Sequence, residues 1–239
     1  MAKIIISKHM FGADIDGAME RALKDTSQSP TQPPITAKPA INIDDWVYVP
    51  KIGLYVSEKK LLHNLNYDDT HKELEQLDLS MPMPAQFREF LKFLRDSNAQ
   101  EHQKIFKEIT EARDPWRAEW LNAKFEQRSD SRYMLSQNAI ENGKCGNIEQ
   151  KLTNYLNEDK TPGISLDAWL DSKTSHGLPE PTINNGKFYY WAPVSGYVAR
   201  VDALSLRAVL DCDGHPEALN PSLGVHACAV APKKIYGVK

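Results

Sequence analysis

The C-terminal part of the chain predicts a series of short strands, and this feature constrains the fold more than any other. Two central segments, 198–204 and 207–213, each alternate between two kinds of side chain. Successive side chains of a strand point to opposite faces of its sheet. One face is expected to meet the core because it carries only small or apolar residues: Ala199, Val201, Ala203, Ala208, Leu210 and Cys212.

The opposite face of these two segments mixes both charges with aliphatic side chains. It carries Arg200, Asp202, Leu204, Arg207, Val209, Asp211 and Asp213. A strand face that only meets water usually holds Lys, Glu, Thr and Ser, so the mixture favours a surface that makes contacts, although ordinary variation also produces it. We expect Arg200, Asp202, Arg207 and Asp211 to share one outward face.

The composition of the same region is also unusual. From Ala192 to Ala231 there is no Lys, Gln, Met or Trp, and Glu217 is the only Glu. These residue types are the ones that a codon cannot encode when its first two letters vary and its third stays a pyrimidine. Mutagenic reverse transcription of adenines in Asn-type codons leaves that pattern. The alternative is a β region of small residues that lacks long side chains for structural reasons.

Several motifs carry a family resemblance. They are Tyr190-Trp191-x-Pro193, Val198-Ala199-x-Val201-x-Ala203, Arg207-Ala208-x-Leu210-x-Cys212 and Ser222-Leu223-Gly224-Val225-x-Ala227, with upstream segments at 83–87, 115–121 and 165–170. From about Ile41 onward the chain resembles the variable proteins of diversity-generating retroelements, above all those of archaea and archaeal viruses. That family implies a C-type lectin fold of the formylglycine-generating-enzyme type, in which a constant scaffold displays hypervariable residues for ligand binding.

On this resemblance we predict an α+β protein in which two helices pack on a small mixed or antiparallel sheet. Residues 41–239 would form the C-type-lectin-like domain, with a variable region at about 190–231. Residues 1–40 would form an N-terminal segment that ends in a linker rich in Pro, Ser and Thr.

The resemblance also implies which positions are diversified and contact the ligand. They are Ala192, Val194, Ser195, Gly196, Tyr197, Arg200, Asp202, Leu204, Leu206, Arg207, Val209, Asp211, Asp213, Gly214, His215, Ala218, Leu219, Asn220 and His226. Glu217 departs from the codon pattern and is left out, and Trp191 is either an anchor of the site or part of its floor. The expected partner is a protein or glycan on a host or neighbouring cell surface.

Two other classes of function stay open. The first is an oxidoreductase of the formylglycine-generating kind, which needs a close pair of cysteines. Cys212 and Cys228 lie too far apart in the sequence to match that motif, so we expect no catalytic residue and no cofactor. The second is a structural virion or tail component whose C-terminal face packs against another subunit.

Metal sites are not expected either. Glu180-Pro181-Thr182 and Trp191-Ala192-Pro193 match only in part the loop and strand with which lectins of this fold bind calcium. Asp211, Asp213 and His215 alternate along one strand and would need further ligands from elsewhere. Solvated acids at a strand end explain them better.

The net charge and the first residues of the chain limit which partners and which cellular location we expect. The 29 basic and 32 acidic residues nearly balance, which gives no footprint for nucleic acid. Ile4–Ile6 is the only strong apolar run at the start, too short for a signal peptide or a membrane span. We therefore expect cytoplasmic synthesis, with retention there or incorporation into a virion, no membrane insertion, and, with only three cysteines, no disulfide framework.

Further elements follow from periodicity and turn residues. A strand and a helix are expected within 4–24, and a hairpin at 46–56. After the hairpin we expect a helix capped by Thr70 and two helices that start after Pro84 and near Glu101. We then expect strands at 120–125 and 132–135, a turn at Asn142-Gly143 and a short helix capped by Ser165. The signal between Gly146 and Pro162 is weak. For Arg113–Arg117 we favour an ion pair with cation–π packing on Trp116 over a ligand role.

Overall fold

The computed structural model describes residues 45–230, which contain four helices and eleven strands. The strand and helix expected within 4–24, and the linker that follows them, lie outside the described residues. Helices and mixed sheets occur together, so the predicted α+β class is confirmed.

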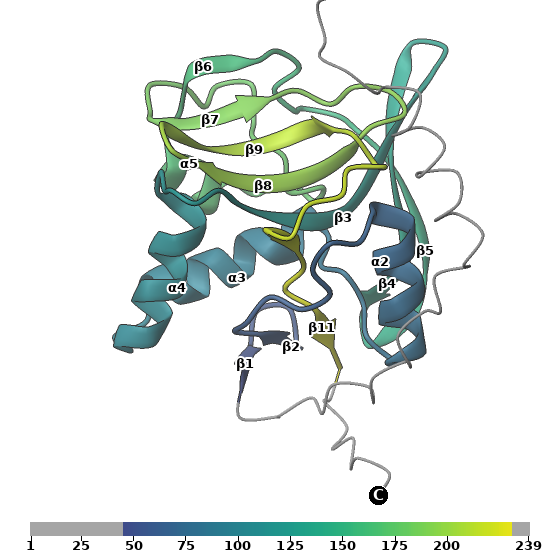
Figure 1. Ribbon diagram of the computed structural model, residues 1–239. Helices are drawn as coiled ribbons and strands as arrows, with labels where there is room; N and C mark the ends of the chain where they lie inside the picture. Colours follow the sequence, from purple (N-terminus) through teal and green to yellow (C-terminus); the bar gives the residue numbers. More distant parts are fainter. Residues whose placement is uncertain (1–44, 231–239) are drawn as a thin grey trace, which may run out of the picture. The chain divides into compact units, whose positions relative to one another are not determined.

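The larger sheet organises the domain (Figure 1). In spatial order its strands are β5 (Lys144–Lys151), β4 (Ser131–Glu141), β3 (Arg117–Arg128), β8 (Val198–Leu204), β9 (Arg207–Gly214), β7 (Phe188–Trp191) and β6 (Lys160–Ile164), and β10 (Leu223–Gly224) pairs with the start of β3. Neighbours are antiparallel except for β7 with β9 and β10 with β3. The sheet is therefore mixed, and both strands of the two-faced C-terminal pair lie at its centre.

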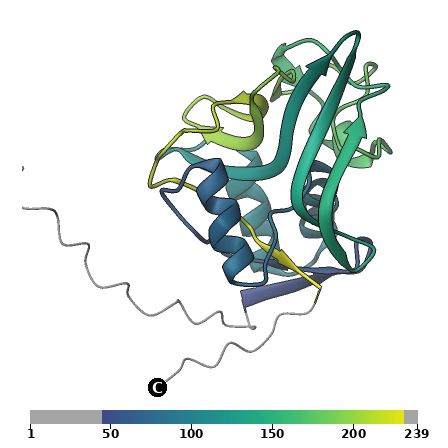
Figure 2. The same ribbon diagram turned by 90° about the vertical axis from the view of Figure 1, so that its right-hand side faces the viewer.

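A second sheet joins the two ends of the described chain. It consists of β1 (Trp46–Val49), β2 (Leu54–Ser57) and β11 (Cys228–Ala229), in the order β1-β2-β11. Figure 2 shows the yellow β11 beside the purple hairpin of β1 and β2. The predicted hairpin is confirmed, with Gly53 at a positive φ of 66° in its turn.

Helices cover the inner face of the larger sheet. Both α3 (Pro84–Asp96) and α4 (Gln100–Thr110) begin where the sequence predicts and pack on its central strands. Phe87, Phe90, Leu91 and Leu94 form the predicted apolar stripe of α3, and all four are buried. The six small or apolar side chains expected to face inward from β8 and β9 are buried as well.

The helix near Thr70 begins earlier than predicted. Helix α2 (Tyr67–Gln76) follows Asn66, whose Oδ1 accepts a hydrogen bond from the Asp69 backbone N–H at 2.8 Å. Thr70 lies inside the helix, and its hydroxyl donates to the Asn66 carbonyl. Asn66 and Thr70 both favour helix starts, and the prediction took the later of two valid caps.

Two strands lie where the sequence gave a weak signal. Strand β5 is mostly exposed and so shows no apolar alternation, and it is held in register by pairing with β4 after the turn at Asn142 and Gly143. Strand β6 pairs with β7 at the opposite edge. These strands form by backbone pairing with a neighbouring strand. Such pairing does not require alternating apolar and polar side chains, so the sequence shows no strand pattern there.

The short helix α5 (Leu166–Asp171) confirms its predicted cap. Ser165 Oγ accepts a hydrogen bond from the Ala168 backbone N–H at 3.2 Å. Trp169 is fully buried, stacks on Phe188 with ring centres 5.4 Å apart, and donates from Nε1 to the Gly177 carbonyl at 2.8 Å. This contact joins α5 to the loop that runs past the start of α3.

Gly177 is the residue at which that loop tolerates least change. Its φ is +81°, and an added Cβ would lie 2.1 Å from the Ala85 backbone nitrogen. We expect Gly177→Ala to lower the free energy of unfolding by more than about 3 kcal/mol, because backbone strain and steric overlap add. Gly143→Ala is the matched control, since Gly143 has a φ of +74° with nothing near its Cβ position. It should cost only about 1–2 kcal/mol in urea unfolding, and equal losses would contradict the close approach.

Candidate functional site

The outer face of β7, β8 and β9 brings the predicted contact residues together. Strand register places Arg200 opposite Asp211, and Asp202 opposite Val209. The parallel pairing adds Tyr189 beside Val209 and Trp191 beside Asp211. The expectation that Arg200, Asp202, Arg207 and Asp211 share one face is therefore confirmed by the register.

The expectation that this whole face meets solvent is wrong at its centre. Asp202 is 2% exposed and Asp211 is 0% exposed. Arg200 joins them: its Nη2 and Nε lie 2.7 and 2.8 Å from Asp211 Oδ2, and Nε lies 3.1 Å from Asp202 Oδ2. A buried charge is tolerated when it is paired and hydrogen-bonded. These three side chains thus form a structural triad and not an open contact surface.

Aromatic rings and an arginine form the part of the face over β7 and β9. The Arg207 guanidinium lies 5.5 Å from the ring centre of Tyr189 and 5.2 Å from that of Trp191, at distances that allow cation–π attraction. All three side chains are partly exposed. Trp191 therefore contributes to the surface itself. Sequence reasoning missed Tyr189, because all four residues of β7 are aromatic and their alternation is hidden.

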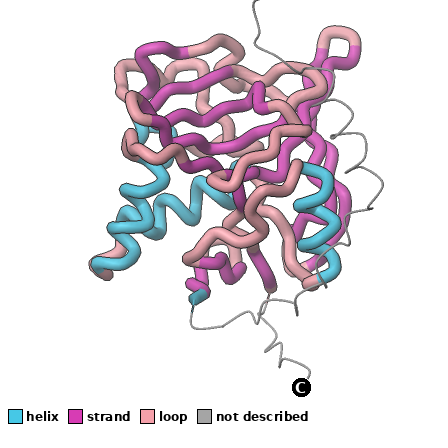
Figure 3. The backbone as a smooth tube through the Cα atoms, viewed as in Figure 1, coloured by secondary structure: helices cyan, strands magenta, loops and turns pink. Residues whose placement is uncertain are grey.

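The most exposed predicted positions lie in the connections, drawn in pink in Figure 3. Because β7 and β9 are parallel and β8 is antiparallel to them, the loop 192–197 and the segment from His215 onward leave the same end of the sheet. Val194, Ser195, Gly196, His215 and Leu219 are exposed there, while Ala192, Tyr197, Asp213, Ala218 and Asn220 are partly buried. Tyr197 and His215 meet edge to face at 5.9 Å. We call this end of the sheet the rim.

The turn at the other end of β8 and β9 holds two more predicted positions. Leu206 is 86% exposed and Leu204 is partly buried. They lie a strand length away from the rim, because β8 and β9 run between the two ends. The predicted contact residues therefore divide between two surfaces, of which the rim is the larger.

Three further predicted positions are corrected. His226 is fully buried, with Nδ1 2.6 Å from the Ser57 carbonyl oxygen and Nε2 3.0 Å from Glu119 Oε2. Val209 is fully buried, and Gly214 is buried with the Val198 carbonyl oxygen 2.9 Å from where a Cβ would lie. Neither His226 nor Val209 can reach a ligand at the surface, and Gly214 has no room for a side chain.

The corner before β3 is partly as expected. Arg113 Nη1 and Arg117 Nη1 each lie 3.8 Å from Glu108 Oε2, which ties the corner to α4. Within residues 45–230 the cation–π contacts involve Tyr133, Tyr189 and Trp191, so the packing expected on Trp116 is not found. The ion pairs are part of the corner, and the aromatic contact was wrong.

Both cysteines considered for catalysis lie in the interior. Cys212 and Cys228 are fully buried. Burial raises the pKa of the Cys212 thiol well above its usual range and that of Cys228 to about 12. Since the thiolate is the reactive form, neither side chain is set up as a nucleophile. In the described part of the chain, no three His, Cys, Asp or Glu side chains gather as metal ligands would.

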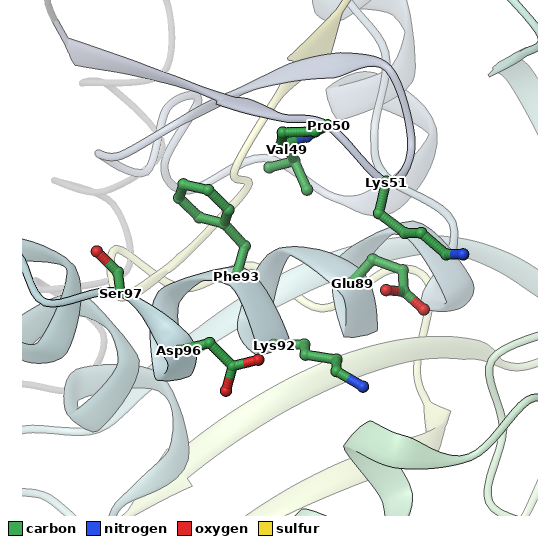
Figure 4. A pocket seen from close by; sticks show the side chains of 8 residues that line it. All are labelled: Val49, Pro50, Lys51, Glu89, Lys92, Phe93, Asp96 and Ser97. Carbon is green, nitrogen blue, oxygen red and sulfur yellow. The ribbon is translucent and has the colours of Figure 1, made fainter.

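A separate hollow of about 460 Å³ lies between the β1–β2 hairpin and α3 (Figure 4). Phe93 points toward Val49 and Pro50, and charged side chains of Lys51, Glu89, Lys92 and Asp96 line its edge. None of the predicted contact residues lines this hollow.

Comparisons of the chain with protein-family models, curated proteins and solved structures find no match. Within residues 45–230 no helix has both the length and the apolar character needed to span a bilayer. The described chain is an α+β domain with a charged triad on the outer face of its central strands and an exposed rim at one end of them.

The triad gives a test of which outer-face positions tolerate exchange. Arg200→Met would leave Asp211 buried without a cation, and we expect a loss of about 3–5 kcal/mol in the free energy of unfolding. Leu206→Ala removes an exposed side chain from the turn that joins the same two strands and should change stability by less than about 0.5 kcal/mol. Urea titrations of both variants compare them directly. Similar midpoints would show that the triad does not stabilise the sheet.

Asp213 predicts a pH dependence of stability. Burial and a hydrogen bond with Asp211 raise the pKa of the Asp213 carboxyl to about 7. A carboxyl with a raised folded-state pKa binds its proton more tightly in the folded protein, so stability falls as pH rises from about 4 to about 7. Asp213→Asn keeps a neutral hydrogen-bond donor at every pH.

The difference in Tm, variant minus wild type, should therefore be larger at pH 8 than at pH 4. The side chain is partly exposed, so solvent screening limits the size of the effect. Asp130→Asn, in the exposed β3–β4 turn, controls for the loss of one negative charge. A Tm difference that is the same at both pH values would rule out the protonated Asp213 in the folded state.

Proposed function

We propose that this protein is a ligand-binding protein of the diversity-generating retroelement type, with a C-type lectin fold of the formylglycine-generating-enzyme kind. Its variable region would span about 190–231, and its partner would be a protein or glycan on a host or neighbouring cell. The observation that carries the proposal is the rim, where the two loops that contain most of the exposed predicted variable positions leave the same end of one sheet.

The rim has the chemistry of a recognition surface. Tyr197 and His215 supply rings that are already in contact, so little side-chain entropy is lost when a ligand binds. Ser195 and Asn220 add hydrogen-bonding groups, and Val194 and Leu219 add apolar area. Loop side chains with few contacts can be exchanged at low cost in stability.

The scaffold beneath the rim supplies the rigidity that such a surface needs. The inner faces of β8 and β9 pack on helices, and the triad of Arg200, Asp202 and Asp211 fastens the two strands together on their outer face. We therefore restrict the proposed set of contact residues to the exposed and partly buried positions at the rim, together with Leu204, Leu206 and Arg207. Asp202, Val209, Asp211, Gly214 and His226 leave the set, and Arg200 belongs to the scaffold.

Neither alternative class gains support of the same kind. A formylglycine-generating-type oxidoreductase needs reactive thiols, and Cys212 and Cys228 are buried with raised pKa values. A structural subunit whose C-terminal face packs on a neighbour needs a continuous apolar interface. The exposed apolar side chains Val194 and Leu219 lie at the rim, whereas Leu206 lies at the other end of β8 and β9.

Sequencing the DNA around the gene tests the proposal. We expect a nearby, non-translated copy of the segment that encodes Ala192–Ala231, differing from it mainly at adenines, and a reverse-transcriptase gene beside it. The differences should fall on codons of rim residues such as Val194 and Leu219 and spare those of Ala199 and Leu210, which face the core. Absence of both the copy and the reverse transcriptase, or differences spread evenly over core and rim codons, would overturn the proposal.

A further inference from the structure

A second cavity, of about 490 Å³, lies beside the start of β3. Its walls come from α4, from the segment Arg113–Arg117, from residues 58–63 after β2, and from Pro221 and Ser222 before β10. None of the positions predicted to be variable lines it. The cavity is therefore separate from the rim, and the inference below does not depend on the proposed function.

Arg117 lines this cavity and is 9% exposed. Its Nη2 is held by the interior, 3.0 Å from Glu119 Oε1 and 2.8 Å from His226 Nε2. Its Nη1 has no hydrogen-bond partner, and the Glu108 carboxylate lies 3.8 Å away, beyond hydrogen-bonding distance. One side of the guanidinium is thus fixed, and the other keeps unused donors.

Two more buried donors of the same cavity lack a partner. They are Arg113 Nε and the indole Nε1 of Trp116. Lys60 Nζ donates to the Ala118 and Ser222 carbonyl oxygens, which leaves its third proton free. A buried donor without an acceptor is unfavourable, so an acceptor supplied by a ligand would stabilise this site.

Acidic side chains also line the cavity, but each has a basic neighbour. Glu101 pairs with Lys104 at 3.4 Å, Glu58 lies 3.3 Å from His102, and Glu108 is shared by Arg113 and Arg117. Five lining residues are Lys or Arg and three are Glu. Among the described residues Lys60 forms no ion pair, and burial lowers the pKa of its amine to about 8. A cation without an ion-pair partner, in a cavity with more basic than acidic side chains, favours an anion.

We propose that this cavity binds a small ligand through an oxyanion group, a carboxylate, phosphate or sulfate, held by Arg117, Arg113, Lys60 and Trp116. Arg presents paired donors that match the oxygens of such a group. The cavity is far larger than an inorganic anion, and the ring of Trp116 supplies an apolar wall. The geometry therefore fits an oxyanion carried on a small organic body, such as a sugar phosphate.

Trp116 provides a direct readout of binding. Trp46, Trp120 and Trp169 are buried, whereas Trp116 and Trp191 are partly exposed. In a full-length Trp191→Phe background, Trp116 is the one partly exposed tryptophan within the described residues. Glucose 6-phosphate, inorganic phosphate, glucose and sodium chloride at matched ionic strength are titrated against its fluorescence.

We expect a saturable fluorescence change with glucose 6-phosphate and no such change with glucose or chloride. Adding Trp116→Phe should abolish the change. Adding Arg113→Gln, at a partly exposed position, should weaken binding about tenfold by removing a charge-assisted donor, with the variant's circular dichroism confirming that it folds. Lys51→Gln removes a positive charge from the other hollow and should leave binding unchanged.

The comparison of the two phosphates identifies what fills the cavity. Tighter binding of glucose 6-phosphate than of inorganic phosphate supports an organic ligand, and equal binding supports recognition of the oxyanion group alone. A response to phosphate that grows linearly and equals that of chloride would overturn the proposal. So would a saturable response that Arg113→Gln leaves unchanged, since the oxyanion would then bind elsewhere.

Discussion

Close packing on the inner face of β8 and β9 is the constraint on which the rest of the domain depends. The side chains of Ala199, Ala203 and Ala208 on this face are short, so α4 can pack close to the strands. The chain on either side of this contact is then fixed: α4 leads through the Arg113–Arg117 corner into β3, which pairs with β8. Interior packing at crystal-like density makes such a contact sensitive to the size of each side chain.

The outer face of the same strands shows how a sheet can be rigid and still carry charge. Arg200 forms ion pairs with two carboxylates within one layer of side chains, so Asp202 and Asp211 are each buried beside a cation. The exposed side chains of this region lie at the ends of the strands instead. The proposed recognition surface consists of loops held by a fixed sheet, which is the common arrangement of binding sites on β scaffolds.

The rim and the second cavity differ in what supports them. Rim side chains such as Val194 and Leu219 make few contacts, whereas Arg117 belongs to a buried network with Glu119 and His226. Burial alone would raise the pKa of the Glu119 carboxyl, but Arg117 and His226 lower it to about 2. Residues of the rim can therefore be exchanged, whereas the second cavity requires Arg117 and its buried partners to stay the same.

The sequence by itself determined which side of β8 and β9 each of their residues occupies. Alternation along 198–213 separated the inner from the outer face, the stripe of α3 and the cap of α5 were readable from spacing and residue type, and Asn142-Gly143 marked its turn. Such signals are local, because they depend on neighbours along the chain.

Only the tertiary structure decided how deep each residue lies. Alternation placed Asp202 and Asp211 on the outward face, and the resemblance placed His226 in the contact set, yet all three are buried. Arg200, from the same strand as Asp202 and the strand next to Asp211, pairs with the two aspartates, and Arg117, Glu119 and the Ser57 carbonyl come from other segments to the histidine. The pattern of a strand reports direction, while burial depends on what packs against it, and those contacts join residues that lie far apart in the sequence.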